Sequence, residues 1–472
     1  MTHRPTPIEP ENIGRLIAER IHDPRLRGNL ARATTTSLVK RAAVVADYDD
    51  WESMRAVAHD IKRHVLDHAD DYLARFERQA TAAGATVHFA GDAEDASRLI
   101  CEIAARHGRR VAVKSKSMTG EEIDLTHALE RAGLETIETD LGEYIIQLAE
   151  EPPSHITAPA LHKSRGEIGQ LFSEKLGIEY SDDPERLTEV ARAVLREDFL
   201  RADVGVSGVN FAIAESGTLC IVENEGNARL STTLPRVHIA VMGFEKLLPD
   251  FETLSLFLNL LGRSATGQRL TCYTSLITGP RRADEHDGPD ELHIVILDNG
   301  RARLLADAAL REALLCIRCG ACLNVCPVYQ KIGGHGYGSI YPGPIGSVIT
   351  PIFRGETRAA GLPFASSLCG ACADICPVHI DLHHLLLTWR ARISGKRKGK
   401  WTERLIMWTF VRVAARTALF DLAGRLLRVF GPLLRSRDGG LRVPIWSDTR
   451  TFPAPPPRSF KQCWRADQER PS

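Results

Sequence analysis

Apolar residues recur every three or four positions in two early stretches of the chain, residues 13–22 and 51–80. This spacing follows the 3.6-residue turn of a helix, and charged residues occupy many of the positions between. Asp49 and Asp50 precede the second stretch and supply a candidate N-cap. We therefore predict an N-terminal helical region over residues 1–80.

From about residue 84 the pattern changes to short apolar strands that alternate with helices, and the first of these helices are predicted at 93–106 and 121–132. Strand–helix alternation is typical of a mostly parallel sheet covered by helices on both faces. We predict one α/β domain over residues 81–300, with strands at 86–90, 110–114, 135–138, 211–214, 218–223, 236–242, 270–276 and 291–297.

The next segment, residues 301–395, begins as a helix and runs into a cysteine-rich loop. A second cysteine loop follows, and the stretch between the two, 333–346, contains too much glycine and proline for regular structure. A helix is predicted at 381–393, after the second loop. The last segment, 396–472, is a basic amphipathic region that ends in a proline-rich tail.

Seven of the eleven cysteines lie in these two loops. The first loop reads Cys316-Ile-Arg-Cys-Gly-Ala-Cys-Leu-Asn-Val-Cys-Pro. Its C-x2-C-x2-C-x3-C-P spacing is the signature of bacterial ferredoxins, whose thiolates hold cubane iron–sulfur clusters. The second loop reads Cys369-Gly-Ala-Cys-Ala-Asp-Ile-Cys-Pro and has Ser366 where another cysteine would begin the pattern. Structural zinc sites are the alternative, but they use widely separated C-x2-C pairs.

The fourth cysteine of such a run ligates the other of two clusters. The spacing therefore predicts two [4Fe-4S] clusters, with cluster 1 held by Cys316, Cys319, Cys322 and Cys376 and cluster 2 held by Cys326, Cys369 and Cys372. Cluster 2 is one cysteine short. Its fourth ligand is left open between Ser366, a water, a histidine and a partner residue, and loss of that iron would leave a [3Fe-4S] cluster.

Composition excludes few classes of protein. Lys and Arg total 60 and match the 60 Asp and Glu, so the net charge gives no reason to expect a nucleic-acid partner. The N-terminus lacks the apolar core of a signal peptide, and the chain has no run of about 18 uncharged apolar residues. We expect a cytoplasmic protein without a spanning helix, and its 472 residues suffice for two or three domains.

Taken with residues outside the cysteine runs, the motifs resemble a known family, the lactate utilisation protein B (LutB) group. The stretches that carry the resemblance are the two cysteine runs, Tyr341-Pro-Gly-Pro-Ile-Gly between them, and Gly205-Val-Ser-Gly-Val-Asn-Phe-Ala-Ile-Ala-Glu-Ser-Gly-Thr upstream, which is similar to the signature of the LUD domain. The resemblance covers nearly the whole chain, and the second run of the family also has three cysteines. It implies an α/β LUD-type domain joined to an α-helical, bacterial-ferredoxin-like 4Fe-4S module.

The resemblance further implies electron relay during oxidation of L-lactate to pyruvate, by a subunit of an oxidoreductase complex rather than a stand-alone enzyme. The partners it implies are a cysteine-rich LutA-like subunit and a LutC-like LUD subunit, and a link to a membrane quinone is a further hypothesis. A competing hypothesis is a non-redox protein that binds or senses a small carboxylate and uses its clusters for structure or regulation. We find no secure G-x-G-x-x-G fingerprint for a dinucleotide.

Three polar residues are candidates for a small-anion site. Lys114 and Lys116 follow a predicted strand, where ligands bind in open α/β sheets. Glu215 lies in a Glu-Ser-Gly-Thr stretch between two predicted strands, whose backbone N–H groups could face an anion. The simpler interpretation is two surface lysines and a solvated hairpin turn.

Residues 396–437 contain eleven Lys or Arg against Glu403 and Asp421, interleaved with Trp401, Trp408 and other apolar residues. A basic amphipathic helix of this kind can dock on an acidic partner or lie on an anionic membrane surface. We favour partner docking, followed by peripheral contact with the inner face of the membrane and then by packing on this chain.

Overall fold

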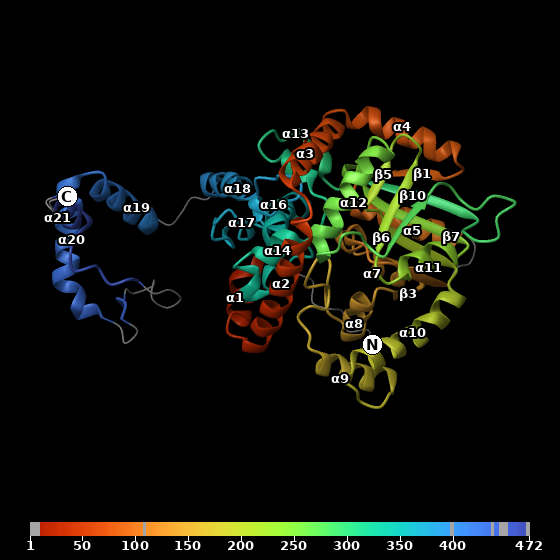
Figure 1. Ribbon diagram of the computed structural model, residues 1–472, viewed down its shortest axis with the longest axis horizontal. Helices are drawn as coiled ribbons and strands as arrows, with labels where there is room; N and C mark the ends of the chain where they lie inside the picture. Colours follow the sequence, from red (N-terminus) through yellow and green to blue (C-terminus); the bar gives the residue numbers. More distant parts are fainter. Residues whose placement is uncertain (1–9, 107–109, 397–400, 436–438, 443–451, 469–472) are drawn as a thin grey trace. The chain divides into compact units, whose positions relative to one another are not determined.

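The computed structural model of the chain describes residues 10–106, 110–396, 401–435, 439–442 and 452–468. The chain divides into two compact units, residues 1–393 and 394–472. The larger unit contains the predicted sheet and both cysteine loops (Figure 1).

Six parallel strands form the main sheet, in the order β1–β10–β7–β4–β2–β3. Both faces of its central strands are buried, so β7 and β10 read as nearly continuous apolar runs. The prediction of a mostly parallel α/β sheet is confirmed. The strands are β1 Thr86–Ala90, β2 Val111–Lys114, β3 Glu135–Glu138, β4 Val204–Gly208, β7 Val237–Gly243 and β10 Glu291–Leu297.

Helices cover both faces of this sheet, as predicted. Alternate residues of β2 point to opposite sides, so Ala112 packs with α5 and α7 while Val111 and Val113 pack with α8, α9 and α10. The helices of the first layer are α5 Ala93–Ala105 and α7 Leu125–Arg131, and those of the second are α8 Leu141–Ala149, α9 Arg165–Leu176 and α10 Pro184–Arg201. The helix predicted at 121–132 is two helices, because α6 (Met118–Glu122) ends before Asp124, which has a left-handed φ of 55°.

A smaller second sheet, in the order β8–β5–β6–β9, was not separated from the first by the sequence pattern. Strands β5 and β6, and β6 and β9, pair antiparallel. The sheet packs on α12 (Phe251–Thr266), where Phe211 and Phe257 meet at a ring distance of 5.5 Å. Its strands are β5 Phe211–Ile213, β6 Thr218–Glu223, β8 Leu247–Leu248 and β9 Tyr273–Ile277.

Strand β4 lies in the main sheet but was not predicted, because Gly205 and Gly208 lower the strand propensity of its sequence. A Cβ on Gly205 would lie 1.7 Å from the carbonyl oxygen of Ser231, which lies in helix α11 (Asn227–Thr233). The glycine is therefore required for the close approach of that helix to the strand.

Four helices precede the main sheet: α1 Ile13–Arg20, α2 Pro24–Val45, α3 Trp51–Asp67 and α4 Ala69–Ala82. The helix predicted over 51–80 is thus broken at His68, and Asp50 precedes it without a side-chain capping bond. Helix α2 was not predicted as a separate helix, because only three of its residues are buried, Leu26, Leu30 and the polar Thr34, and they form a weak apolar pattern.

The cysteine-rich segment consists of short helices that lie beside α1, α2 and α3 (Figure 1). The stretch 333–346 is not wholly irregular, because α16 begins at Gly343 and continues through Pro351. The helices are α13 Arg301–Ala306, α14 Ala321–Val325, α15 Tyr329–Ile332, α16 Gly343–Arg354, α17 Ala371–Asp374 and α18 Leu382–Lys396, with short 3-10 turns at Arg311–Leu315, His335–Tyr337 and Leu362–Phe364.

The C-terminal unit contains α19 (Trp401–Ala414), α20 (Thr417–Phe430) and α21 (Phe460–Gln468). Large apolar side chains on α19 and α20 are exposed, among them Trp401 at 74% and Phe410 at 61%. No helix of the described residues is long and apolar enough to cross a membrane. Four of the basic residues counted in this region, Arg397, Lys398, Lys400 and Arg437, lie outside the described residues.

Candidate metal centres

Four cysteines from the two loops surround one cavity. Its lining includes Ile156, Arg318 and Ile345 together with the sulfur-bearing residues Cys316, Cys319, Cys322 and Cys376. Electrostatic interactions link Cys319 to Cys376 and to Cys316, and Cys322 to both Cys316 and Cys319. The last cysteine of the second loop is therefore grouped with the first three of the first loop.

The other three cysteines form a second group. Cys326 interacts electrostatically with Cys369, and Cys372 interacts with both Cys326 and Cys369. Cys322 also interacts with Cys372, so the two groups are neighbours. Cys369 is exposed, whereas Cys326 and Cys372 are buried.

The donor atoms suit an iron–sulfur cluster, because buried thiolates need compensating cations. Burial raises the pKa of Cys319 and Cys322, and it raises the pKa of Cys376 to about 11. At neutral pH these sulfurs would be protonated unless a metal took the place of the proton. A sulfur-only donor set that converges on one cavity is the chemistry that iron–sulfur clusters and zinc prefer.

Cations lie close around the first cysteine group. Lys62, Lys246 and Arg318 all interact electrostatically with Cys316, and each is at most 9% exposed. Burial lowers the pKa of Lys62 to about 7 and that of Lys246 to about 8. Buried cations next to thiolates favour an anionic guest, and a cluster with four thiolate ligands is anionic.

Arg55 and Arg41 approach the same group from α3 and α2. Arg55 donates from Nε to the carbonyl oxygen of Cys376 at 2.8 Å and from NH2 to that of Asp374 at 2.7 Å. Arg41 donates to the carbonyl oxygen of Ile375 at 3.2 Å. The N-terminal helices therefore hold the end of the second cysteine loop in place and bring positive charge to it.

A buried ion network connects the main sheet to the first cysteine loop. Arg301, which follows β10 and is fully buried, donates twice to Glu122, at 2.8 and 2.9 Å, and once to Glu245, at 2.7 Å. Arg318 lies 3.6 Å from the other oxygen of Glu245. The hydroxyl of Tyr341, from the Tyr-Pro-Gly-Pro stretch, donates to Glu122 at 2.8 Å. One network of buried ion pairs thus connects the carboxyl end of the sheet to the first cysteine loop.

The charged residues around Cys316 and in the buried ion network were not predicted from the sequence. Each is a single Lys, Arg or Glu in an otherwise ordinary helix or loop. Arg318 alone carried a signal, because it stands inside the Cys-Ile-Arg-Cys motif.

The three candidates for the anion site are not brought together. Lys114 is fully buried and donates to Glu121 at 2.8 Å and to Glu138 at 2.7 Å, so its charge is already matched. Glu215 lies exposed in the turn between β5 and β6 of the second sheet. Among the described residues no hydrogen bond or ion pair connects it to Lys114 or Lys116.

Lys116 differs from its neighbour. Its Nζ atom is buried and has no hydrogen-bond partner within the described part of the chain. Electrostatic interactions connect it to Glu143, Glu225 and His155. His155 also lies against the first cysteine loop, because a Cβ on Gly320 would come within 3.2 Å of its ring. The polar group around Lys116 therefore adjoins the first cysteine group.

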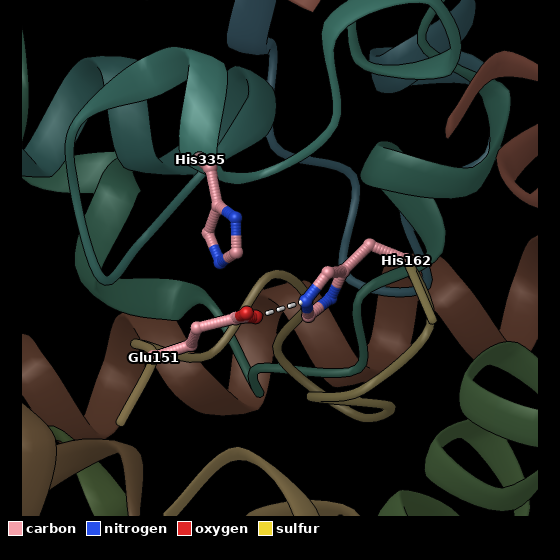
Figure 2. Close-up of side chains that lie close together, drawn as sticks. All are labelled: Glu151, His162 and His335. Carbon is pink, nitrogen blue, oxygen red and sulfur yellow. Dashed lines mark hydrogen bonds and ion pairs between the residues drawn. The ribbon is translucent and has the colours of Figure 1, made fainter. Parts of the chain in front are cut away.

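Glu151, His162 and His335 converge where the loop after α8 meets the segment between the cysteine runs (Figure 2). One donor atom of each lies within 4.8 Å of the others. His162 bonds Glu151 at 2.6 Å, Lys163 donates to the other carboxylate oxygen at 2.8 Å, and His335 donates to the carbonyl of Pro152 at 2.8 Å. Burial would raise the pKa of Glu151, but the hydrogen bonds and charges of His162 and Lys163 lower it to about 2. We interpret the group as a set of polar contacts that hold the two segments together.

Sequence comparisons divide the chain into three matched regions. The LUD domain profile matches residues 73–297, the 4Fe-4S dicluster domain profile matches 312–380, and the profile of the C-terminal region of lactate utilisation protein B matches 390–469. The dicluster match agrees with the presence of two iron–sulfur clusters.

Two curated relatives match the chain over almost all of its length. Lactate utilization protein B of Bacillus pumilus is 44% identical over 463 residues, which cover 96% of this chain and 97% of the relative. The protein of the same name from Bacillus cereus is 43% identical over 459 residues, which cover 96% of each.

A solved structure of a DUF162 family protein from Deinococcus radiodurans also aligns, over 48% of this chain and 98% of its own, at 16% identity and a TM-score of 0.28. That score is too low to bear on the fold. With all three domain profiles in order and near-full-length relatives above 40% identity, the chain belongs to the lactate utilisation protein B family.

Proposed function

We propose that this chain is the iron–sulfur electron-transfer subunit of a complex that oxidises L-lactate to pyruvate. The observation that carries the proposal is the cavity lined by Cys316, Cys319, Cys322 and Cys376, in a chain of the lactate utilisation protein B family. Its partners would be a cysteine-rich LutA-like subunit and a LutC-like LUD subunit.

Cluster 1 would be held by the four cysteines of the cavity, and cluster 2 by Cys326, Cys369 and Cys372. A bound cluster of this kind takes up and gives back one electron at a time, at a potential set by charge, hydrogen bonding and exposure. Lactate oxidation releases two electrons, so a further redox centre, on a partner, is needed to separate the pair.

The chain's own residues prepare the surroundings of cluster 1. Apolar side chains such as Ile156 and Ile345 line the cavity and exclude water. Lys62, Lys246 and Arg318 place positive charge beside Cys316, which favours the more negative, reduced form of a bound group. Cluster 2 has the exposed Cys369 and is the better placed of the two to exchange electrons with a partner.

Anaerobic purification followed by iron and sulfide assays and EPR tests the proposal. We expect about eight irons per chain, and a reduced-cluster EPR signal that lactate generates only when the two partner subunits are present. Stoichiometric zinc with negligible iron would refute the cluster assignment. Clusters that lactate never reduces in the assembled complex would refute the electron-transfer role.

A second candidate function is the binding of a small carboxylate, with the clusters in a structural or regulatory role. The buried Nζ of Lys116, which has no hydrogen-bond partner among the described residues, supports it. Three carboxyl groups, those of Asp140, Glu143 and Glu225, share that neighbourhood and oppose an anion there. Calorimetric binding of L-lactate to the isolated chain, abolished in Lys116→Met, would favour this function over the first.

A further inference from the structure

Ser366 occupies in the second cysteine loop the place that Cys316 occupies in the first. Each stands four residues before the glycine of its loop, Gly320 in one and Gly370 in the other. In both loops a short helix begins directly after that glycine, α14 in the first and α17 in the second. The two loops can therefore be compared position by position.

The backbones of the two loops match at their most unusual positions. Arg318 and Leu368, two residues after Cys316 and Ser366, have φ values of 62° and 57°, a left-handed conformation that residues other than glycine rarely adopt. The loop glycines follow with φ values of 76° and 82°. Because both loops adopt the same unfavourable conformation at the same step, they direct their side chains in the same way.

A matching hydrogen bond fixes the side chain at the compared position. The backbone N–H of Arg318 donates to Cys316 Sγ at 3.4 Å, and the backbone N–H of Leu368 donates to Ser366 Oγ at 3.1 Å. The oxygen of Ser366 thus accepts a hydrogen bond from the backbone N–H two residues later, as the sulfur of Cys316 does. In the first loop that sulfur lines the cavity shared with Cys319 and Cys322.

We propose that Ser366 Oγ is the fourth ligand of cluster 2, completing the set of Cys326, Cys369 and Cys372. This rests on the proposed function, since it requires that the clusters are present. The serine hydroxyl loses its proton to solvent, which reaches this partly exposed residue, and an oxygen–iron bond forms. The Leu368 N–H stabilises the resulting alkoxide as it would a thiolate.

Two other polar side chains, Ser367 and His383, lie near this corner of the loop. The hydroxyl of Ser367 bonds the sulfur of Cys369 and, after the backbone N–H of Ala371, lowers the pKa of that cysteine. His383 lies near Gly370 with its Nδ1 2.9 Å from Asp381 Oδ1, but within the described structure no hydrogen bond fixes that nitrogen, in contrast to Ser366 Oγ. Ser366 is the polar side chain that the loop geometry holds in the position of a ligand.

The test compares Ser366→Ala, Ser366→Cys and the control Ser255→Ala, at an exposed serine of α12, with the native full-length chain, all purified anaerobically. Each is oxidised mildly, and the three-iron EPR signal and the iron content are followed with time. We expect iron loss from Ser366→Ala to be at least about tenfold faster than from the native chain. Iron loss from Ser366→Cys should be slower than native, because thiolate is the softer ligand, and Ser255→Ala should lose iron at the native rate.

Equal rates in the native chain and Ser366→Ala would overturn the proposal, and so would a Ser366→Cys variant no more resistant than the native chain. The unchanged reduced-state EPR signal of cluster 1 serves as the check that each variant is folded. A native chain that holds no clusters would instead refute the proposed function, so the two failures are distinguishable.

Discussion

Single buried side chains set the chemistry of the first cysteine group. Four sulfurs line its cavity, and Lys62, Lys246 and Arg318 bring charge to within electrostatic reach of one of them, Cys316. The cysteines provide ligands, whereas the cations decide how stable each charge state of a bound cluster is. The two roles can be tested separately.

Replacement of Cys376 tests the exchange of cysteines between the loops. Cys376→Ala should perturb the same cluster as Cys316→Ala, because both side chains line one cavity. The cluster perturbed by Cys369→Ala should differ from it. EPR spectra of the three reduced variants, each compared with the native spectrum, measure this. A spectrum of Cys376→Ala that matches Cys369→Ala would show that each loop holds its own cluster.

Removal of a buried cation should lower the reduction potential of cluster 1. A unit charge about 8 Å away at an effective dielectric constant of about 20 contributes about 2 kcal/mol, which is about 90 mV for one electron. Lys62→Gln keeps a donor for the Glu245 carbonyl oxygen but removes the charge. Redox titration at pH 6, where Lys62 with its pKa of about 7 is mostly protonated, should show a fall of this order when followed by EPR.

Arg63→Gln is the matched control, since Arg63 lies on the same helix but its side chain is 59% exposed and its charge is screened by solvent. An equal shift in both variants would mean that the effect does not come from a nearby buried charge.

The helices of the C-terminal unit differ in character from those around the clusters. In α18, Leu386, Trp389 and Ile393 are buried, whereas α19 and α20 carry large exposed apolar side chains between arginines. Exposed apolar surface of this extent marks an interaction site. We therefore propose that α19 and α20 bind a partner subunit, with a lipid surface as the second candidate.

Truncation after Ser394 should leave both clusters in place, because all seven cysteines of the two loops lie in the larger unit. Iron content and EPR spectra should match those of the native chain. Co-purification with the partner subunits should be lost or become weak.

Binding by the native chain should also weaken with salt, because the Debye length falls from about 10 Å at 0.1 M to about 3 Å at 1 M. Retained complex formation together with lost binding to anionic vesicles would identify the membrane as the ligand of α19 and α20. Loss of the clusters on truncation would show that these helices belong to the folding core.

The larger unit is held together across its parts by charge as well as by apolar packing. Glu122 comes from α6, Arg301 follows β10, Glu245 follows β7 and Arg318 lies in the first cysteine loop. All four are at most 9% exposed. A buried charge that loses its partner is costly, so these residues make the sheet and the cysteine loop depend on each other.

Arg301→Met should destabilise the larger unit strongly, because it leaves Glu122 and Glu245 buried without their main partner. Breaking a buried pair in this way typically costs about 3–5 kcal/mol. The measurement is the urea midpoint of the anaerobic protein, followed both by far-ultraviolet circular dichroism and by loss of cluster absorption. We expect both probes to shift together.

Arg303→Met, on the exposed side of the same helix α13, is the control and should shift the midpoint far less. A shift of the midpoint in only one of the two probes in Arg301→Met would contradict the coupling.

Short-range patterns were enough to predict much of this protein. Strands β1, β3, β6 and β10 begin and end where the pattern of apolar residues and the flanking polar and turn residues place them. The cysteine spacing was likewise sufficient to predict two clusters, since it reflects how a short loop wraps around a cube of iron and sulfur.

Other features depended on contacts between residues far apart in the chain. Strand β4 needs Gly205 against α11, and a glycine lowers the local strand signal that would reveal it. Lys114 and Lys116 look alike in sequence, yet one is matched by Glu121 and Glu138 and the other has no such partner in the described structure. A side chain's neighbours are set by how the strands and helices pack.

The amino-acid sequence by itself therefore determined the α/β class, the family and the ligand types, because these follow from local periodicity and from the spacing of reactive residues. Only the tertiary structure decided which cations surround Cys316, and how Glu122, Arg301 and Glu245 join the sheet to the cysteine loop. It also showed that backbone N–H groups hold Ser366 Oγ and Cys316 Sγ in the same way. Burial and charge pairing depend on distances between residues in the folded chain, and these distances cannot be read from the order of the residues alone.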